Sequence, residues 1–312
     1  MENKMKIAFL DYDTLGYDIS IEPFKSFGEV TVYGFSDYEQ TLKRIAGVDI
    51  VITNKVVIDK YIMDNSNIKL ICVAATGMNN IDLEYAKQKN IEVKNVKGYS
   101  THSVTQLTFS FVLYFVQKFE YYVNYTADKK WEKSKIFVNL DEPFCELKNK
   151  NWGIIGLGEI GKNVASIAKA FGCNISYYST SNKNFCNDFE KLSLENLLQK
   201  CDIITIHAPL NENTRNLLGK KELRMLKNGA ILVNVGRGGI INEADLAKVL
   251  DEKEIYVGLD VVEIEPIQKQ NPLNFVTNKN RLKITPHIGW SSVEARNELT
   301  NGIINNIKSF VL

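Results

Sequence analysis

Three kinds of reactive side chain follow predicted strands in the last third of the chain. In "ILVNVGRGG", Arg237 stands between glycines, which leave the backbone free to direct a guanidinium into a crevice. "GLDVVEIEP" supplies Asp260, Glu263 and Glu265, and "ITPHIG" supplies His287. An imidazole is the side chain that changes charge most readily near neutral pH. These groups would bring a cation, carboxylates and an imidazole to one edge of a sheet.

A glycine-rich loop precedes these residues. "GIIGLGEIG" places Gly156, Gly158 and Gly161 in the spacing G-x-G-x-x-G, after an apolar strand and before a helical stretch. The first glycine permits a tight turn, the second lets the backbone approach a pyrophosphate, and the third lets the helix pack on the strand. Phosphate then binds the N–H groups at the helix N-terminus. The pattern predicts a dinucleotide-binding unit; the competing interpretation is a glycine-rich turn alone.

The end of the next strand departs from the usual dinucleotide-binding pattern. An acidic residue is expected there to bind the ribose hydroxyls, but the strand ends with Ser179, Thr180 and Ser181, and Lys183 follows. No carboxylate would repel a 2′-phosphate, and hydroxyls and a lysine stand near to receive one. The choice between NAD and NADP is therefore open.

The elements that must position these residues indicate an α/β fold. Short β-branched runs alternate with amphipathic stretches along the 312 residues, which predicts two doubly wound parallel sheets in two domains. Capping boxes formed by Ser103 with Gln106 and by Ser291 with Glu294 predict the starts of two helices. His287 then lies between a strand end and a helix start, where ligands bind in open α/β sheets.

Composition excludes several classes of function. Lys and Arg number 38 against 37 for Asp and Glu, so no strong field attracts nucleic acid or an anionic membrane. No signal peptide and no run of eighteen apolar residues is found, which predicts a cytoplasmic protein. The five cysteines show no C-x-x-C spacing, so we expect buried thiols and neither a metal site nor a disulfide framework. They are Cys72, Cys145, Cys173, Cys186 and Cys201.

Together these motifs resemble the D-isomer-specific 2-hydroxyacid dehydrogenases. "GLGEIG", "HAPLNENT", "VNVGRGG", "GLDVVEIEP" and "TPHIG" follow that family's order and extend the resemblance over essentially the whole chain. "AATGMNNIDLEYAK" and "NVKGYSTHSVTQLTF" are most similar to the branch of glycerate dehydrogenases and hydroxypyruvate reductases. Taken singly, Arg237, Glu265 and His287 are more typical of surface or structural roles, and only their order after the glycine-rich loop favours catalysis.

The resemblance implies a role for each member of this trio. Arg237 would bind the carboxylate of a 2-oxo acid and polarise its carbonyl. His287 would protonate the carbonyl oxygen as the nicotinamide delivers hydride. Glu265, directly before a proline, would orient the imidazole and raise its pKa; Glu263 is the carboxylate most easily confused with it.

The resemblance also implies the binding residues. The substrate carboxylate would meet Thr76 and Gly77, together with Arg237 and His287. The expected cofactor contacts are Gly156, Gly158, Glu159, Ile160, Gly161, Ser179, Thr180, His207, Ala208, Pro209, Thr214, Val235, Gly236, Asp260 and Gly289.

The family's chain path implies a discontinuous substrate domain, residues 1–101 with 287–312, and a dinucleotide-binding domain at 102–286, with closure between them. A homodimer through the cofactor domains follows only from the resemblance. Asn149 stands where the family often has glycine, and because asparagine tolerates positive φ, we expect the turn to survive.

The sequence thus predicts an NAD(P)-dependent reductase of a short 2-oxo acid, with hydroxypyruvate or glyoxylate first. Two alternatives stay open: a broader D-lactate-type 2-hydroxyacid dehydrogenase, and a binding protein of the same fold that senses the nicotinamide cofactor.

Overall fold

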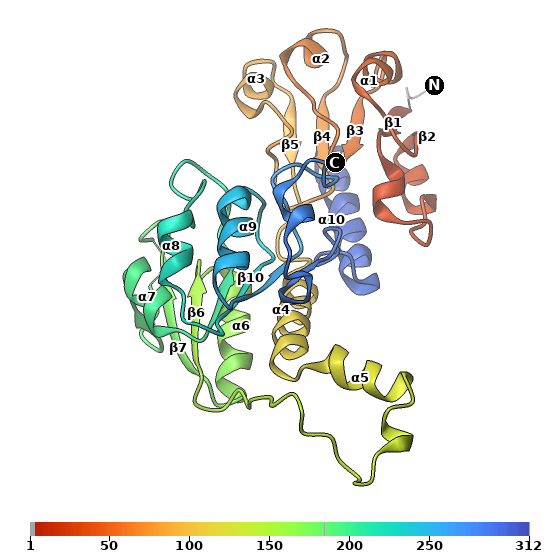
Figure 1. Ribbon diagram of the computed structural model, residues 1–312. Coiled ribbons are helices and arrows are strands. Elements are labelled where there is room, and N and C mark those ends of the chain that lie inside the picture. The colour runs from red at the N-terminus through yellow and green to blue at the C-terminus, as the bar shows by residue number, and fades with distance from the viewer. Residues whose placement is uncertain (1–3, 184, 312) are drawn as a thin grey trace. The chain divides into compact units, whose positions relative to one another are not determined.

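The protein forms two compact units in the computed structural model, which describes residues 4–183 and 185–311 (Figure 1). Unit 1 comprises Met1–Ser100 and Trp290–Leu312, and unit 2 comprises Thr101–Gly289. Each unit is built on one parallel sheet, because β-branched strands alternate with amphipathic helices along the chain. The predicted fold class, two doubly wound parallel sheets with one domain discontinuous in sequence, is confirmed.

The sheet of unit 1 has the strand order β2-β1-β3-β4-β5. Its strands are β1 (Met5–Phe9), β2 (Gly28–Val32), β3 (Ile50–Thr53), β4 (Leu70–Val73) and β5 (Glu92–Lys94). Its helices are α1 (Tyr38–Arg44), α2 (Lys60–Asp64), α3 (Leu83–Gln88) and α10 (Val293–Val311), with short 3-10 helices at Tyr12–Leu15 and Glu22–Ser26.

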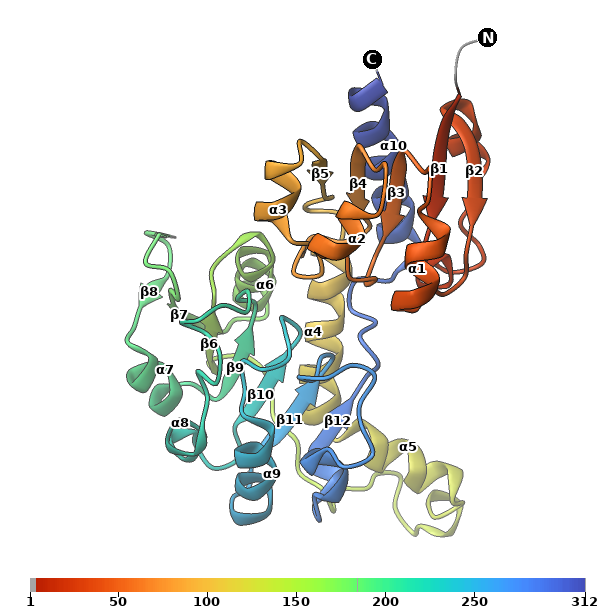
Figure 2. The same cartoon turned by 90° about the horizontal axis from the view of Figure 1, so that it is seen from above.

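Alternate residues of each strand in unit 1 enter two different cores. Ile7 and Phe9 of β1 pack with α10, whereas Ala8 of the same strand packs with residues of α2 and α3. Figure 2 shows α10 along one face of the sheet and the shorter helices on the other. Both faces are thus covered, as a parallel sheet requires.

The sheet of unit 2 has the order β12-β11-β10-β9-β6-β7-β8. Its strands are β6 (Asn151–Ile155), β7 (Asn174–Tyr178), β8 (Glu190–Lys191), β9 (Ile203–Ile206), β10 (Ile231–Asn234), β11 (Tyr256–Leu259) and β12 (Leu282–Ile284). Its helices are α4 (Thr101–Val116), α5 (Phe119–Ala127), α6 (Glu159–Ala170), α7 (Leu194–Lys200), α8 (Lys220–Met225) and α9 (Glu243–Glu252), with 3-10 helices at Trp131–Lys133, Pro272–Phe275 and Lys279–Arg281.

The chain changes direction across the unit 2 sheet next to β6. From β6 the chain proceeds to β7 on one side, and it returns to β9 on the other. The loops that follow β6 and β9 therefore diverge at the carboxyl edge, which is the position where open α/β sheets bind ligands. The fold thus places "GLGEIG" and "HAPL" side by side.

The structure contradicts one local prediction, shifts a second by one residue and confirms a third. Helix α4 begins at Thr101, so Ser103 lies inside the helix and the predicted cap there is wrong. The hydroxyl of Ser292, one residue after the predicted Ser291, accepts the N–H of Ala295 at 3.2 Å and caps α10. Asn149 has φ +64°, so the expectation that asparagine sustains this turn is confirmed.

The cysteines are free but only partly buried. Cys72, Cys173 and Cys201 are buried, whereas Cys186 is half-buried and Cys145 is exposed, so the expectation of buried thiols is wrong for the last two. In the part of the chain that the structure describes, no helix combines the length and apolarity needed to cross a membrane.

Candidate active site

The glycine loop of unit 2 connects β6 to α6 through three positions with different steric demands. Gly156 has φ +92°, and a Cβ there would lie 2.8 Å from the backbone nitrogen of Ala208. A Cβ on Gly161 would lie 2.3 Å from the carbonyl oxygen of Gly156, so neither position accepts a side chain. Around Gly158 the space is open to 4 Å, and no side chain caps α6 at this residue.

This loop fits a dinucleotide. The open approach at Gly158 and the uncapped N-terminus of a twelve-residue helix leave backbone N–H groups for a pyrophosphate. The carboxylate of Glu159, the first residue of α6, is engaged within the protein, because its Oε1 accepts the hydroxyl of Thr101 at 2.6 Å. Ile160 is half-buried and packs on the adjoining core.

The end of β7 lies against the same loop. The N–H of Gly156 donates to the carbonyl of Tyr178 at 2.9 Å. Ser179, the next residue, is 3% exposed, and among the described residues its buried hydroxyl has no hydrogen-bond partner. Thr180 follows half-buried. An unpartnered buried hydroxyl is unusual in a folded protein and indicates a place where a polar ligand completes the hydrogen bonding.

The loop after β9 lies on the other side of the place, next to β6, where the chain changes direction across the sheet. Both ring nitrogens of His207 are buried without a partner among the described residues, and burial lowers the pKa of His207 to about 3. The imidazole is therefore neutral at physiological pH. Thr214 is fully buried, donates to the carbonyl of Pro209 at 2.7 Å and accepts the N–H of Asn211 at 2.8 Å. Its hydroxyl shapes the turn that begins at Ala208.

Arg237 follows β10 and the buried Val235 on a loop held by one asparagine. Asn234 accepts the N–H of Gly236 at 3.0 Å and donates to the carbonyl of Arg237 at 2.8 Å. The guanidinium is half-buried and donates to the carbonyl of Gly236 at 2.8 Å. No carboxylate of residues 4–183 or 185–311 pairs with it. Arg237 is thus a cation aimed by its backbone and available to an anion.

Glu265 and His287 form the pair that the sequence predicts. Glu265 Oε2 lies 2.7 Å from His287 Nδ1, and its Oε1 accepts the N–H of Val262 at 3.2 Å. The competing carboxylate, Glu263, instead pairs with Arg215 at 3.1 Å on the surface. Because Nδ1 is bonded to a carboxylate, Nε2 is the nitrogen left to face a substrate.

The backbone at His287 is left-handed, with φ +54°, and Asp260 holds it there. The buried carboxylate of Asp260 accepts the hydroxyl of Thr285 at 2.6 Å and the N–H groups of Ile288 at 2.8 Å and Gly289 at 2.7 Å. The N–H of His287 donates to the carbonyl of Asp260 at 2.9 Å. A histidine in this conformation needs such support, because a side chain in the left-handed region is strained.

Burial raises the pKa of Asp260, while the bonds from Thr285, Gly289 and Ile288 lower it. The sequence predicts that this aspartate contacts the cofactor. In the structure its carboxylate is committed to the loop on both sides of His287. Its position directly after a buried strand is the sequence signal for a residue that holds a neighbouring loop.

Unit 1 carries the predicted substrate-binding loop at the carboxyl edge of β4. Thr76 is exposed there and Gly77 is half-buried. The hydroxyl of Thr76 donates to the carbonyl of Val96 at 3.0 Å, and the side chain of Asn95 donates to the carbonyl of Thr76 at 2.5 Å. These bonds fix the loop against the segment that follows β5.

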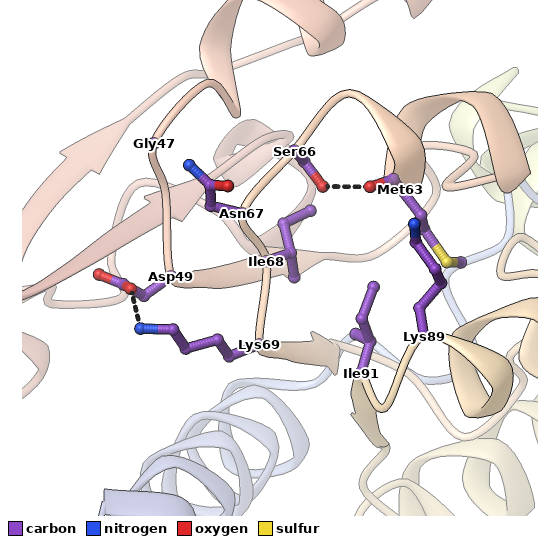
Figure 3. Close-up of a pocket in the computed structure, with 9 residues that line it drawn as sticks. All are labelled: Gly47, Asp49, Met63, Ser66, Asn67, Ile68, Lys69, Lys89 and Ile91. Atoms are coloured by element: carbon purple, nitrogen blue, oxygen red, sulfur yellow. Dashed lines mark hydrogen bonds and ion pairs between the residues drawn. The ribbon is translucent and has the colours of Figure 1, made fainter.

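The opposite edge of unit 1 has a pocket of about 420 Å³ that is not a candidate active site (Figure 3). Its walls precede β3, β4 and β5, so it lies at the amino ends of the strands, away from the edge where α/β sheets bind ligands. Its two lysines are already paired, Lys69 with Asp49 and Lys89 with Asp64, each at 2.8 Å. Among the described residues that line this pocket, no charge is left unpaired to define a ligand.

Two residues of these edges were missed by the sequence analysis. Asn234 ends β10 and holds the Arg237 loop, and Asp11 follows β1 in unit 1 and is buried. Both are polar residues at the end of an apolar strand, which is a visible signal, but their partners are set by the fold.

Comparison with known proteins is consistent across sequence and structure. The family model described as D-isomer specific 2-hydroxyacid dehydrogenase, NAD binding domain, matches residues 109–289. A hydroxypyruvate reductase of Blautia hydrogenotrophica is 35% identical, covering 98% of this chain and 97% of that protein. A glycerate dehydrogenase of Methylorubrum extorquens is 32% identical, covering 98% and 96%.

A solved structure agrees with these relatives. An acyclic imino acid reductase in complex with NADPH and D-Arg has a TM-score of 0.85 and 30% identity, covering 98% of this chain and 97% of that one. The resemblance predicted from the motifs is therefore confirmed. The chain belongs to the D-isomer-specific 2-hydroxyacid dehydrogenase family, in the branch of glycerate dehydrogenases and hydroxypyruvate reductases, and is an NAD(P)-dependent oxidoreductase.

Proposed function

We propose that this protein reduces a short 2-oxo acid, hydroxypyruvate or glyoxylate first, with His287 as the proton donor. The observation that carries the proposal is the 2.7 Å contact of His287 with Glu265, in the unit that also carries Arg237 and the glycine loop. The names of relatives, which include hydroxypyruvate reductase, glycerate dehydrogenase and glyoxylate reductase, support the choice of substrate.

In this proposal unit 2 holds the cofactor and the proton-transfer groups. The glycine loop, Ser179 and the His207 loop would hold NAD(P)H, which when bound supplies the hydride. Arg237 binds the substrate carboxylate and polarises the carbonyl. His287 Nε2 protonates the carbonyl oxygen, and Glu265 fixes the ring through Nδ1. In the oxidative direction the same nitrogen accepts the proton.

Unit 1 is the substrate domain in the same proposal, and the backbone at Thr76 and Gly77 receives the carboxylate. A cytoplasmic location and the absence of a nucleic-acid or membrane partner stay predictions from the sequence.

The first experiment follows the loss of NADH or NADPH absorbance as four 2-oxo acids are added in turn. We expect hydroxypyruvate and glyoxylate to turn over faster than pyruvate and 2-oxoisocaproate. Preference for pyruvate or 2-oxoisocaproate would instead support the broader D-lactate-type enzyme. Cofactor binding without turnover of any of the four would support the cofactor-sensing protein and contradict the proposal.

Replacing His287 tests the proton donor. His287→Ala removes the group that protonates the carbonyl oxygen, so we expect kcat to fall by about a hundred- to ten-thousandfold. NAD(P)H affinity, measured by fluorescence titration, is expected to change little. His102→Ala, on the exposed face of α4, is the matched control and should retain full activity. A His287→Ala enzyme with most of its rate would require another acid.

We propose that Ser179 lies beside the 2′ position of the cofactor ribose and affects the choice between NADH and NADPH. Ser179→Asp places a carboxylate beside that position, where it accepts the hydroxyls of NADH but repels a 2′-phosphate. We expect the ratio of NADPH to NADH dissociation constants, measured by fluorescence titration, to rise by about tenfold or more. Ser110→Asp, on the exposed face of α4, should leave the ratio unchanged. An unchanged ratio in Ser179→Asp would show that this strand end does not read the 2′ position.

We further propose a homodimer that uses α5 and the segment after it. No residue of α5 is buried within the chain, and apolar side chains of this segment are exposed to an extent unusual for a monomer. They are Phe119, Val123, Trp131, Ile136, Phe137, Leu140 and Phe144. Figure 1 shows this segment extending from the end of α4.

A single charge in the apolar segment tests the dimer. Phe119→Asp suits the first turn of a helix but desolvates a carboxylate in an interface. We expect the dimer dissociation constant, measured by sedimentation velocity, to rise by about thirtyfold or more. Phe35→Asp, at a phenylalanine of unit 1 that is somewhat more exposed than Phe119, is the control. A wild-type chain that sediments as a monomer would refute the proposal.

A further inference from the structure

Glu265 reaches His287 from a loop that lies largely in solvent. The loop after β11 is buried as far as Val262, exposed over residues 263–270, and buried again at Asn271. Such connecting segments are more mobile than the strands and helices they join. The carboxylate of Glu265 nevertheless lies 2.7 Å from Nδ1 of His287. The loop must therefore be fixed by contacts with another part of unit 2.

The carboxylate of Glu243, the first residue of α9, bonds to both ends of the exposed stretch. Its Oε1 accepts the N–H of Glu263 at 2.5 Å, and its Oε2 accepts the side-chain N–H₂ of Asn271 at 2.6 Å. Asn271 is held in turn, because its Oδ1 accepts the N–H of the buried Leu273 at 2.9 Å. One side chain of a packed helix thus closes the loop where it leaves the core and where it returns.

The peptide that joins Val262 to Glu263 transmits this support to Glu265. The N–H of Val262 donates to Oε1 of Glu265 at 3.2 Å. The next N–H, that of Glu263, is the one that Glu243 accepts. The same peptide packs on the Arg237 loop, since an added Cβ on Gly238 would lie 1.9 Å from the carbonyl oxygen of Val262. Packing limits the position of the peptide, and the hydrogen bond to Glu243 fixes its orientation.

A second interaction at this point of the loop is weaker. The side chain of Glu263 pairs with Arg215 at 3.1 Å, but the two side chains are 49% and 55% exposed. Ion pairs in solvent contribute little, because water screens them and two long side chains must be ordered to form them. The bonds of Glu243 to Glu263 and Asn271 are therefore the main support of the loop.

We propose that Glu243 is a positioning residue for proton transfer, because it holds the loop from which Glu265 orients His287. The inference rests on the proposed function, in which Nε2 of His287 protonates the substrate. Glu243 acts through Glu265 and does not itself contact the substrate. The loop of Arg237 is held separately by Asn234. Loss of Glu243 therefore affects kcat and leaves the KM of the oxo acid nearly unchanged.

Glu243→Ala is tested against a control from the same turn of α9. We expect kcat to fall by about ten- to hundredfold, because a misplacement of about 1 Å costs up to that factor. The KM of the oxo acid and the dissociation constant of the reduced cofactor should change little. Asp245→Ala is the matched control, because Asp245 is also acidic, lies in the first turn and accepts the N–H of Lys220 at 3.0 Å. Both changes remove a first-turn charge and a bond to a loop, but Asp245→Ala should keep its kcat.

A double-mutant cycle separates positioning from general structural damage. If Glu243 acts through Glu265, adding Glu243→Ala to a Glu265→Ala enzyme should lower kcat by less than about twofold further. Losses that multiply in the double variant would show that Glu243 acts elsewhere and would overturn the inference. An equal loss of kcat in Asp245→Ala would overturn it as well, because the effect would then belong to the helix.

A shorter side chain decides the question if Glu243→Ala does not fold. Glu243→Asp keeps the first-turn charge but withdraws the carboxylate by one methylene from the N–H of Glu263, so we expect a similar loss of kcat. Full kcat in the folded Glu243 variants, beside a slow Glu265→Ala enzyme, would overturn the inference and leave the proposed function intact. A Glu265→Ala enzyme with full kcat would contradict the proposed function and the inference with it.

Discussion

In each unit a buried carboxylate within two residues of the end of one strand accepts N–H groups from the loop after the neighbouring strand. Asp260 follows β11 and holds the loop after β12, while Asp11 follows β1 and holds the loop after β3. A parallel sheet brings these loops to one edge but does not fix their conformation, because backbone N–H groups beyond a strand end have no ladder partner. A carboxylate acceptor supplies that partner. The left-handed backbone at His287 and the backbone conformation of residues 54–56 both depend on this interaction.

The parts of the site that rest on local spacing were predictable from the sequence. The demands on Gly156 and Gly161 come from atoms of one turn and its neighbouring loop, so the glycine spacing carries the information. The sequence also shows that position 179 holds a serine in place of the usual acidic residue, because this position is again defined by local spacing. The sequence also predicts that Arg237, Glu265 and His287 follow neighbouring strands, because β10, β11 and β12 are successive in the chain and adjacent in the sheet. Local pattern and neighbour order together define this half of the site.

The parts that were missed depend on contacts between distant residues. Asp11 bonds residues more than forty positions away, and only the strand order β2-β1-β3 makes them neighbours. The start of α4 is a similar case: the pattern at Ser103 suits a cap, but Thr101 is buried and bonded to Glu159 of the cofactor loop, so the helix begins two residues earlier. Tertiary contacts here override a local capping signal, which is worth only about 1 kcal/mol.

The charges at the carboxyl edge of unit 2 are arranged so that one of them lacks a counter-ion. His287 is bonded to Glu265, and the carboxylate of Asp260 is enclosed by backbone N–H groups. His207 is neutral because burial lowers its pKa to about 3, so it does not repel a nearby cation. Arg237 is left half-buried without a carboxylate among the described residues, a state that costs desolvation and is relieved when an anion binds. In the proposed function, an arginine held on its backbone in this state favours a carboxylate substrate over a neutral carbonyl compound, and this difference would confine the chemistry of the imidazole to oxo acids.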